Sequence, residues 1–233
     1  MRKIGVIGFG GRLGDLIQNV LLELGMDVKI AAVADTDLTA VRGRLRHPGL
    51  TADGIRFYTD AREMLDNEEL DGCMIGTRCN THTPYAVEVL RRNIPLFLEK
   101  PVSVTMEQLR ALDAAGKATA AQTVVSFPLR ASLPVRKAKA IIDSGEIGEV
   151  QHVQAWNNIP YGAGYYHTWC RDESVTGGLF LQKATHDLDY IQYILGHRPM
   201  ELCAMESKQI FKGDKPAGLR CSDCPEERTC PES

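Results

Sequence analysis

The first residues suited to chemistry form a glycine-rich turn. Residues 8–14, Gly-Phe-Gly-Gly-Arg-Leu-Gly, follow a run typical of a β-strand and open a run typical of a helix. In such a strand–turn–helix unit, glycines let the backbone approach a pyrophosphate, and the helix N-terminus attracts the anion. Leu13 stands where a third glycine is usual, and Gly14 comes one place later. The turn predicts a dinucleotide site, with a purely structural glycine turn as the alternative.

A carboxylate at the end of the second predicted strand is the next candidate. Asp35 is placed there to accept hydrogen bonds from a ribose 2′-hydroxyl, and its charge would repel a 2′-phosphate. This favours NAD over NADP, although Arg42 and Arg44 follow closely enough to leave NADP open. A helix N-cap, the role that Asp37 also fits, is the alternative for Asp35.

A lysine just beyond the fourth clear strand is the third candidate. The segment Leu98-Glu99-Lys100-Pro101 lies at the carboxyl edge, where ligands bind in open α/β sheets. A lysine there can hold a substrate hydroxyl, and burial near another cation would lower its pKa. The alternative is a surface salt bridge before a helix.

Alternating elements must position these residues. From residue 3 to about 126, short β-branched runs alternate with segments of helical period, which indicates a parallel sheet with crossover helices. The predicted strands are Lys3–Ile7, Val28–Ala34, Gly72–Ile75, Pro95–Leu98 and Thr123–Val125. The predicted helices are Leu13–Leu24, Asp37–Arg46, Tyr85–Arg92 and Met106–Lys117. The first half is therefore expected to be a doubly wound α/β domain.

The pattern changes after Pro128. We predict a helix over Leu133–Ser144, a half-exposed strand over Val150–Trp156, and a further strand over Met200–Phe211. The apolar segment Leu179–Leu195 has helical spacing in its later half, and residues 213–233 are typical of a loop. Between these elements, residues 157–178 are polar, aromatic and glycine-rich without a clear period. A loop of that length is usually functional.

Composition restricts the class of protein. The 233 residues have a mass of 25.7 kDa, a net charge of −3 and a pI near 6.1, with 44% hydrophobic and 24% charged residues. This is typical of a soluble globular protein that binds small molecules, and no cationic block indicates nucleic acid. No stretch is long and apolar enough to predict a membrane span. Four scattered cysteines, Cys73, Cys79, Cys170 and Cys203, are typical of reduced thiols, so we expect a cytoplasmic protein.

Several of these motifs together resemble the Gfo/Idh/MocA family of NAD(P)-dependent oxidoreductases. The resemblance runs from Lys3 to about Ile210 and is carried, in order, by the glycine turn, Gly76-Thr77-Arg78 leading to His82, Glu99-Lys100-Pro101, Gly145-Glu146-Ile147-Gly148, and Gly177-Gly178 leading to His186-Asp187-Leu188-Asp189. It implies an N-terminal Rossmann domain with a doubly wound parallel sheet over residues 1–126. An incomplete α+β domain for substrate binding and dimerisation would follow over residues 127–233.

The resemblance also implies roles for individual residues. Lys100 would hydrogen-bond the reacting hydroxyl, and His186 would accept its proton when a secondary alcohol is oxidised to a ketone, a role that suits the ordinary pKa of histidine. The implied cofactor-binding residues are Gly8, Phe9, Gly10, Gly11, Arg12, Leu13, Asp35, Thr77, Arg78, His82, Glu99, Lys100 and Arg130. The implied substrate-binding residues are Tyr166, His167, Trp169 and Lys183. Without the resemblance, a packed aromatic cluster and a helix-start histidine would be the simpler interpretations.

Three positions depart from the family pattern. Gln182 stands where many members have an aspartate, four residues before the histidine, and Lys183 follows it in a Lys-x-x-His-Asp arrangement that resembles one subgroup. Cys79 and Pro128 replace residues that are often Asn or Asp. We therefore expect the contacts to the nicotinamide to be less typical of the family than those to the phosphates.

Three further cysteines are the remaining cluster. Cys221, Cys224 and Cys230 have a spacing that could hold a structural zinc, but tetrahedral closure needs a fourth ligand, and no His or Cys follows. We therefore predict no metal, with zinc as the alternative.

Taken together, the sequence predicts an oxidoreductase that transfers hydride between NAD and a secondary hydroxyl of a sugar, cyclitol or related polyol. The alternatives are an NAD-dependent glycoside hydrolase that uses transient oxidation and a non-catalytic dinucleotide-binding protein. Because family members usually continue well past 300 residues, we expect the chain to be a C-terminally truncated fragment of a homo-oligomer. On its own it is expected to bind dinucleotide poorly or to aggregate.

Overall fold

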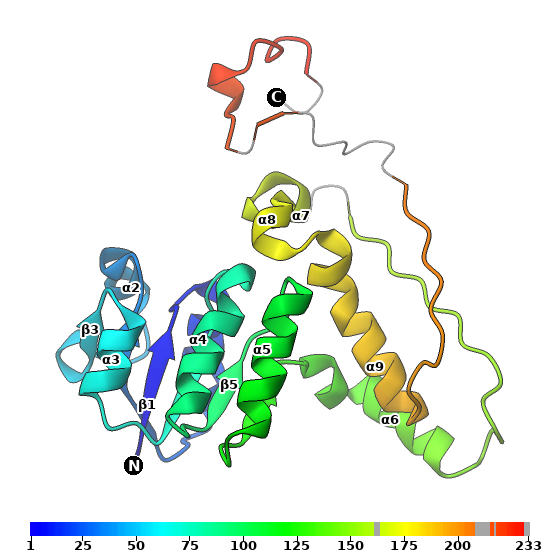
Figure 1. The fold of residues 1–233 in the computed structure, drawn as a ribbon, viewed down its shortest axis with the longest axis horizontal. Coiled ribbons are helices and arrows are strands. Elements are labelled where there is room, and N and C mark those ends of the chain that lie inside the picture. The colour runs from blue at the N-terminus through cyan, green and yellow to red at the C-terminus, as the bar shows by residue number, and fades with distance from the viewer. Residues whose placement is uncertain (161–163, 208–214, 217, 231–233) are drawn as a thin grey trace.

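A parallel β-sheet organises the first half of the chain. The computed structural model describes residues 1–160, 164–207, 215–216 and 218–230. The six strands are β1 (Arg2–Ile7), β2 (Val28–Ala34), β3 (Arg56–Tyr58), β4 (Gly72–Ile75), β5 (Leu96–Leu98) and β6 (Thr123–Val125). They are all parallel in the order β3-β2-β1-β4-β5-β6 (Figure 1). This order reverses direction between β1 and β4, which is the switch point of a Rossmann fold.

Helices connect successive strands. They are α1 (Gly11–Leu16), which continues as the π-helical segment η1 (Ile17–Leu22), then α2 (Leu38–Arg44), the 3₁₀ turn η2 (Ala52–Gly54), α3 (Ala61–Asn67), α4 (Cys79–Arg91) and α5 (Met106–Lys117). Side chains fix several of their starts, because Asp37, Asp60 and Thr105 each accept hydrogen bonds from the first turn of the helix that follows.

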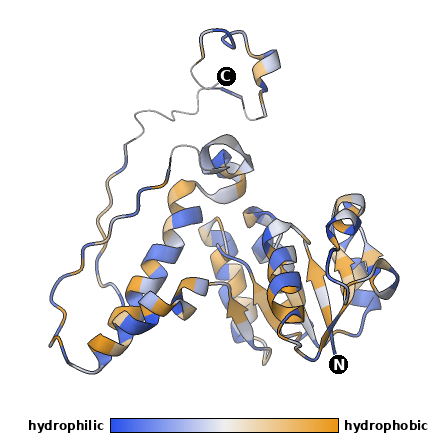
Figure 2. Ribbon diagram, turned by 180° about the vertical axis from the view of Figure 1, so that it is seen from behind, coloured by the Kyte–Doolittle hydropathy of each residue, from blue (hydrophilic) through white to orange (hydrophobic). Residues whose placement is uncertain are grey.

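Two apolar cores lie on opposite faces of the sheet. Successive strand residues alternate between them, as Val6 and Ile7 of β1 show, because side chains on a strand point to opposite faces. One core includes residues of α3 and α4, with α5 packed against it, and the other includes residues of α1 and α2. The apolar strands therefore lie between two helical layers (Figure 2).

In the second half of the chain, the described residues are helical wherever they have regular structure. Its elements are η3 (Pro128–Ala131), α6 (Leu133–Asp143), α7 (Gly164–His167), η4 (Trp169–Arg171), α8 (Glu173–Thr176), the π-helical segment η5 (Phe180–Ala184), α9 (Thr185–Leu195) and η6 (Cys221–Asp223). Helix α9 packs on α6, and α8 packs on α4 (Figure 1). The second contact brings residues 164–178 to the carboxyl edge of the sheet.

The structure confirms the predicted doubly wound α/β fold and corrects several elements. Strand β3 and helix α3 are additional to the predicted set, since a three-residue strand gives little alternation to detect. The predicted strand Val150–Trp156 is wrong, because these residues form no ladder with another strand. The same holds for the described part of the predicted strand Met200–Phe211, whose residues 208–211 lie outside the described range. Both segments alternate in polarity, but a strand also needs a neighbour to take its backbone hydrogen bonds.

None of the helices in the described parts of the chain has both the length and the apolar character that crossing a membrane requires.

Candidate active site

The glycine turn presents open backbone at the N-terminus of α1. Gly8 has a φ of +81°, and a Cβ built on it would lie 2.8 Å from the Thr77 backbone nitrogen, so the close approach of two loops requires glycine here. A Cβ on Gly11 would meet nothing within 4 Å. No side chain caps the helix at Gly10, so the first N–H groups of α1 remain available to an anion.

The two apolar residues of the turn face the core. Phe9 and Leu13 are almost completely buried, and the Phe9 ring lies against Gly14, where an added Cβ would be 3.0 Å from it. Only the backbone of these two predicted cofactor residues is therefore available to a ligand.

Asp35 is hydrogen-bonded to the glycine turn. Its Oδ2 accepts a hydrogen bond from the Phe9 N–H at 2.8 Å, and its Oδ1 accepts one from the Asp37 N–H at 3.0 Å. Arg44 donates a hydrogen bond to the Phe9 carbonyl at 3.3 Å. The carboxylate thus lies beside the turn, as its predicted contact with a ribose requires, and it also holds the turn in place.

Lys100 joins the sheet to the helical half. Its Nζ donates a hydrogen bond of 2.6 Å to the backbone carbonyl of Gln182, at the start of the segment that leads to His186. Burial lowers the pKa of Lys100, and the nearby positive charges of Lys183 and Arg12 lower it further. The two predicted catalytic residues are therefore brought to one place from positions far apart in the sequence.

His186 is half-buried in a positively charged environment. Burial, followed by the positive charges of Lys100, Lys183 and Arg12, lowers its pKa to about 4, and only the adjacent Asp187 opposes this shift. The rings of His186 and Phe127 are in edge-to-face contact, with their centroids 5.9 Å apart. The imidazole is therefore neutral near pH 7 and able to accept a proton.

A buried carboxylate lies next to Lys100. The Glu99 side chain is only 8% exposed, and its Oε1 lies 3.6 Å from Arg12 Nε, which is an ion pair without a hydrogen bond. Arg12 itself belongs to the glycine turn. This ion pair links the turn to the loop that carries Lys100.

Four buried side-chain polar atoms have no hydrogen-bond partner within the described part of the chain. They are Glu99 Oε1, Gln182 Oε1, Thr185 Oγ1 and His186 Nδ1. All four belong to the two segments that the Lys100–Gln182 hydrogen bond joins. Because buried polar atoms are normally paired, this concentration indicates a site for a polar ligand or for water.

His82 has a different environment from the other predicted cofactor residues. It is buried, with Nδ1 2.7 Å from the Pro101 carbonyl and Nε2 3.1 Å from the Thr77 carbonyl. Burial lowers its pKa, and the contacts with the two carbonyls oppose this shift. His82 therefore ties together two loops of the site, and both ring nitrogens already face backbone.

The segment that carries Trp169, one of the predicted substrate-binding residues, meets the N-terminus of α4. The Arg78 guanidinium lies over the Trp169 ring, 4.1 Å from its centroid, and Asn80 donates a hydrogen bond to the Ser174 carbonyl at 3.4 Å. A residue predicted for the cofactor thus contacts one predicted for the substrate. Tyr166 is half-buried in α7, residues 161–163 lie outside the described range, and of His167 only the backbone is described.

Arg130 and Lys183 differ in their partners. Arg130 donates hydrogen bonds of 2.8 and 2.5 Å to the two carboxylate oxygens of Asp189, so its guanidinium is already engaged across η3 and α9. The Lys183 ammonium has no hydrogen bond or ion pair with any residue that the structure describes. Of these two predicted ligand-binding residues, Lys183 is the one with an unengaged charge.

The structure does not gather the three C-terminal cysteines into a metal site. No group of three or more Cys, His, Asp or Glu side chains is placed to hold a metal among the described residues. Cys221, Cys224 and Cys230 are all free thiols.

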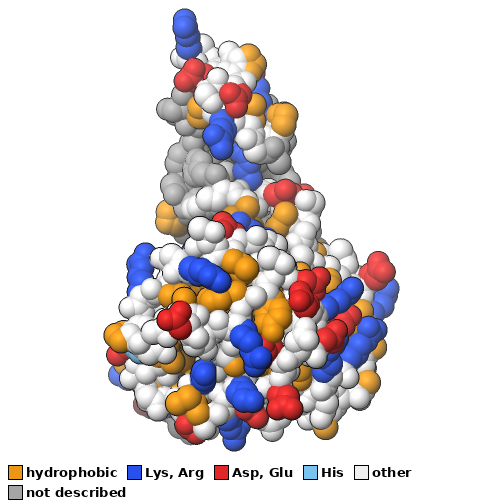
Figure 3. Space-filling model, turned by 90° about the vertical axis from the view of Figure 1, so that its left-hand side faces the viewer, with side chains coloured by type: hydrophobic (Ala, Val, Ile, Leu, Met, Phe, Trp, Pro, Cys, Tyr) orange, Lys and Arg blue, Asp and Glu red, His pale blue; other side chains and the backbone are white. Residues whose placement is uncertain are grey.

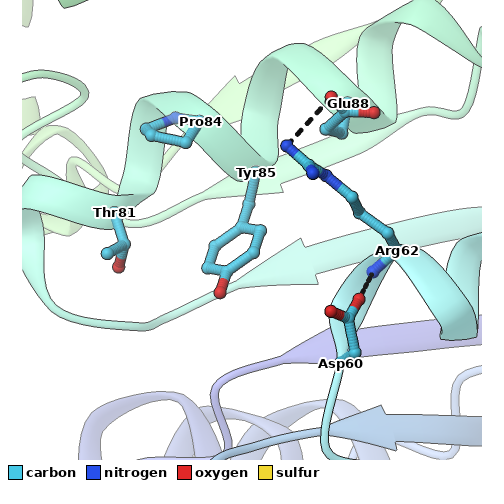
Figure 4. A pocket seen from close by; sticks show the side chains of 6 residues that line it. All are labelled: Asp60, Arg62, Thr81, Pro84, Tyr85 and Glu88. Atoms are coloured by element: carbon cyan, nitrogen blue, oxygen red, sulfur yellow. Dashed lines mark hydrogen bonds and ion pairs between the residues drawn. The ribbon is translucent and has the colours of Figure 1, made fainter.

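A separate surface pocket of about 300 Å³ lies between α3 and α4. At its rim, Asp60 accepts a hydrogen bond from the Arg62 N–H, and the Arg62 guanidinium lies 3.7 Å from Glu88 (Figure 4). On the face around β3, positive and negative side chains are interspersed (Figure 3). This pocket does not include any of the predicted site residues.

Sequence reasoning missed two neighbours of the predicted catalytic residues. Thr185 precedes His186 and has one of the unpaired buried atoms, and Phe127 packs against the imidazole from the end of the sheet. Adjacency to His186 is a signal for Thr185. Nothing in the sequence indicates the Phe127 contact, which depends on how the two halves pack.

Comparisons with known proteins match both halves of the chain. A family model described as an oxidoreductase family with an NAD-binding Rossmann fold, GFO/IDH/MocA, matches residues 2–127. The model of the GFO/IDH/MocA C-terminal domain matches residues 135–219.

Individual relatives agree with these models. The rhizopine catabolism protein MocA of Rhizobium meliloti is 27% identical over 91% of this chain and 62% of its own length. Inositol 2-dehydrogenase 2 of Saccharopolyspora erythraea is 28% identical over 83% of this chain and 54% of its own. The crystal structure of myo-inositol 2-dehydrogenase from Lactobacillus plantarum matches with a TM-score of 0.73 at 24% identity, covering 84% of this chain and 56% of that one. The chain thus spans little more than half the length of these relatives.

Proposed function

The chain belongs to the GFO/IDH/MocA oxidoreductase family with its NAD-binding Rossmann domain, and we propose from this that it oxidises a secondary hydroxyl of a polyol or cyclitol with NAD. Residues 1–126 would bind the cofactor, and residues 127–233 would contribute to the substrate site. Two relatives named as inositol dehydrogenases support the substrate class.

The residues of the glycine turn fit a dinucleotide. The uncapped start of α1 offers N–H groups to a pyrophosphate, and the open space at Gly11 admits it. Asp35, already oriented by the Phe9 N–H, would accept a hydrogen bond from the ribose. Bound NAD would supply the hydride acceptor, C4 of its nicotinamide.

Lys100 and His186 would manage the proton. Lys100 would donate a hydrogen bond to the reacting hydroxyl and stabilise negative charge on its oxygen. His186, neutral because its pKa is about 4, would accept the hydroxyl proton as the C–H hydrogen leaves with its electron pair. The carbinol carbon then becomes a ketone, and the balance is one proton on the protein and one hydride on the cofactor.

The observation that carries this proposal is the convergence of the unpaired buried polar atoms. Glu99, Gln182, Thr185 and His186 each contribute one such atom, and all four residues belong to the two segments that the Lys100–Gln182 hydrogen bond joins. A polyol offers several hydroxyls that both donate and accept hydrogen bonds, which suits a site with several unpaired polar atoms.

The test is a fluorescence titration of the full-length protein with NADH and NADPH, in the wild type and in Asp35→Ala. We expect NADH to bind more tightly than NADPH, and the substitution to weaken NADH binding by about tenfold, because it removes the ribose contact and the Phe9 hydrogen bond. Asp53→Ala, at an exposed site in η2, is the matched control. If neither nucleotide binds the wild type, the proposed function is overturned.

Turnover then separates the enzymatic alternatives. Polyols and cyclitols are screened for net NADH formation, with Lys100→Ala and His186→Ala as variants expected to abolish it. Cleavage of a glycoside without net NADH formation would instead identify a hydrolase that oxidises its substrate only transiently.

A further inference from the structure

We propose that the substrate of this site bears a carboxylate and that Lys183 binds it. The inference rests on the proposed function and narrows the polyol to an acidic one, such as a uronic acid or a carboxylated cyclitol. It depends on which charges face His186 and on which of them are already neutralised.

Lys183 is placed beside the catalytic pair. It lies three residues before His186 at the junction of η5 and α9, and residues at this spacing share a helix face. Its charge is close enough to lower the pKa of both Lys100 and His186. It is half-buried, and its ammonium has no partner among the described residues. A cation held at a site in this way is available to an anionic ligand.

The acidic groups near the site are already engaged elsewhere. Glu99 pairs with Arg12 at 3.6 Å, and Asp187 accepts a hydrogen bond from the Asn157 amide at 2.5 Å. Three cations, Arg12, Lys100 and Lys183, lower the pKa of His186, whereas Asp187 alone raises it. After these pairings, the two lysine ammoniums remain without a carboxylate partner.

The other groups around the imidazole carry no charge. Gln182, one helical turn before His186, is a neutral amide that is 8% exposed and whose buried Oε1 has no hydrogen-bond partner. Phe127 covers one side of the ring, and Thr185 adds a hydroxyl. Glu99 balances the charge of Arg12, and Asp187 offsets part of the charge of the two lysines, so one positive charge around His186 remains uncompensated within the described chain. In a partly buried site, such a charge favours an anionic ligand strongly.

A carboxylate fits this charge better than a phosphate ester. Lys100 donates to the Gln182 carbonyl and would donate to the reacting hydroxyl, which leaves Lys183 as the cation available to the anion. One ammonium matches one negative charge, whereas a phosphate dianion usually takes several donors.

The experiment measures ligand affinity for the NADH complex by calorimetry, with matched probes. The pairs are D-glucuronate with D-glucose and quinate with myo-inositol, and D-glucose 6-phosphate tests a phosphate. In the wild type, we expect at least one carboxylate to bind about tenfold more tightly than its neutral partner. In Lys183→Met, this preference is lost, whereas the affinity for the neutral partner changes little. Lys137→Met, at an exposed lysine of α6, is the control and keeps the preference.

Each other outcome overturns the inference. It fails if neither carboxylate binds more tightly than its neutral partner, if Lys183→Met retains the preference, or if the phosphate ester binds best. NADH affinity is measured first in the same samples. Loss of NADH binding by the wild type overturns the proposed function itself, whereas NADH binding without a carboxylate preference overturns this inference alone.

Discussion

At the scale of single residues, burial and the charges of neighbouring residues determine the pKa of His186. A histidine in water has a pKa near 6.5 and is partly protonated at neutral pH, and the protonated fraction cannot accept a proton. Burial and three cations lower the pKa of His186 to about 4. The protein thus keeps the proposed base in its neutral form over the whole physiological range.

This charge environment leads to a prediction for Lys183→Met. Removing a positive charge stabilises the imidazolium, so the pKa of His186 should rise from about 4 towards its ordinary value of 6.5. The measurement is an NMR titration of the histidine ring protons, with the His186 signal assigned from its absence in His186→Gln. Lys137→Met should leave this pKa unchanged. A wild-type His186 that titrates near 6.5 would contradict the structure's account of the site.

The same shift sets the acid limit of activity. Since His186 must be neutral to accept a proton, kcat/KM should fall only as the pH approaches 4, and in Lys183→Met it should begin to fall at a higher pH.

At the scale of elements, the junction between β1 and α1 depends on one glycine more than on its neighbours. Gly8 has a positive φ, and its added Cβ would meet the backbone of Gly76 at 2.9 Å and of Thr77 at 2.8 Å. Gly11 begins α1 with an ordinary φ and open space around it. Only the first position therefore requires glycine for folding.

We predict that Gly8→Ala lowers the free energy of unfolding by about 2 kcal/mol, through backbone strain and steric overlap. Gly11→Ala should change it by less than about 0.5 kcal/mol, because alanine suits a helix start and nothing obstructs its methyl group. Urea denaturation of both variants gives the comparison. Equal stabilities would show that the turn adopts another conformation.

The elements differ in how well sequence alone predicts them. Strands β2, β4 and β6 and helix α5 have the predicted bounds, because short apolar or β-branched runs and a capping threonine are local signals. Strand β3 and the short helices of residues 164–176 depend on packing against the rest of the molecule, so no local period reveals them. The mistaken strand over Val150–Trp156 has the opposite cause, since its alternating polarity is local but the partner strand that it needs is not present among the described residues.

The features of the candidate site also differ in how well the sequence predicts them. Gly8, Asp35, Lys100 and His186 follow from motif and position. The Lys100–Gln182 hydrogen bond and the unengaged charge of Lys183 follow only from the folded arrangement.

At the scale of the whole molecule, the two halves differ in how completely they bury apolar side chains. The sheet is covered on both faces by helices, and its core residues are almost inaccessible to solvent. In the helical half, α6 and α9 pack on each other but leave large apolar side chains exposed, including Leu133, Ile141, Phe180 and Leu188. Figure 2 shows apolar residues distributed along both α6 and α9. Apolar surface of this kind typically marks an interface.

We therefore predict that the chain self-associates through the surface of α6. In sedimentation velocity, we expect species heavier than a 25.7 kDa monomer to increase with concentration. The double substitution Leu133→Lys and Ile141→Lys should shift the distribution towards the monomer, because it places charges at two exposed apolar positions of α6.

Leu24→Lys, at an equally exposed leucine after η1, is the matched control and should leave the distribution unchanged. Circular dichroism verifies that both variants keep the helical content. A single monomeric species at every concentration would contradict this prediction. The exposed residues of α6 would then be ordinary apolar residues on the surface of a monomer.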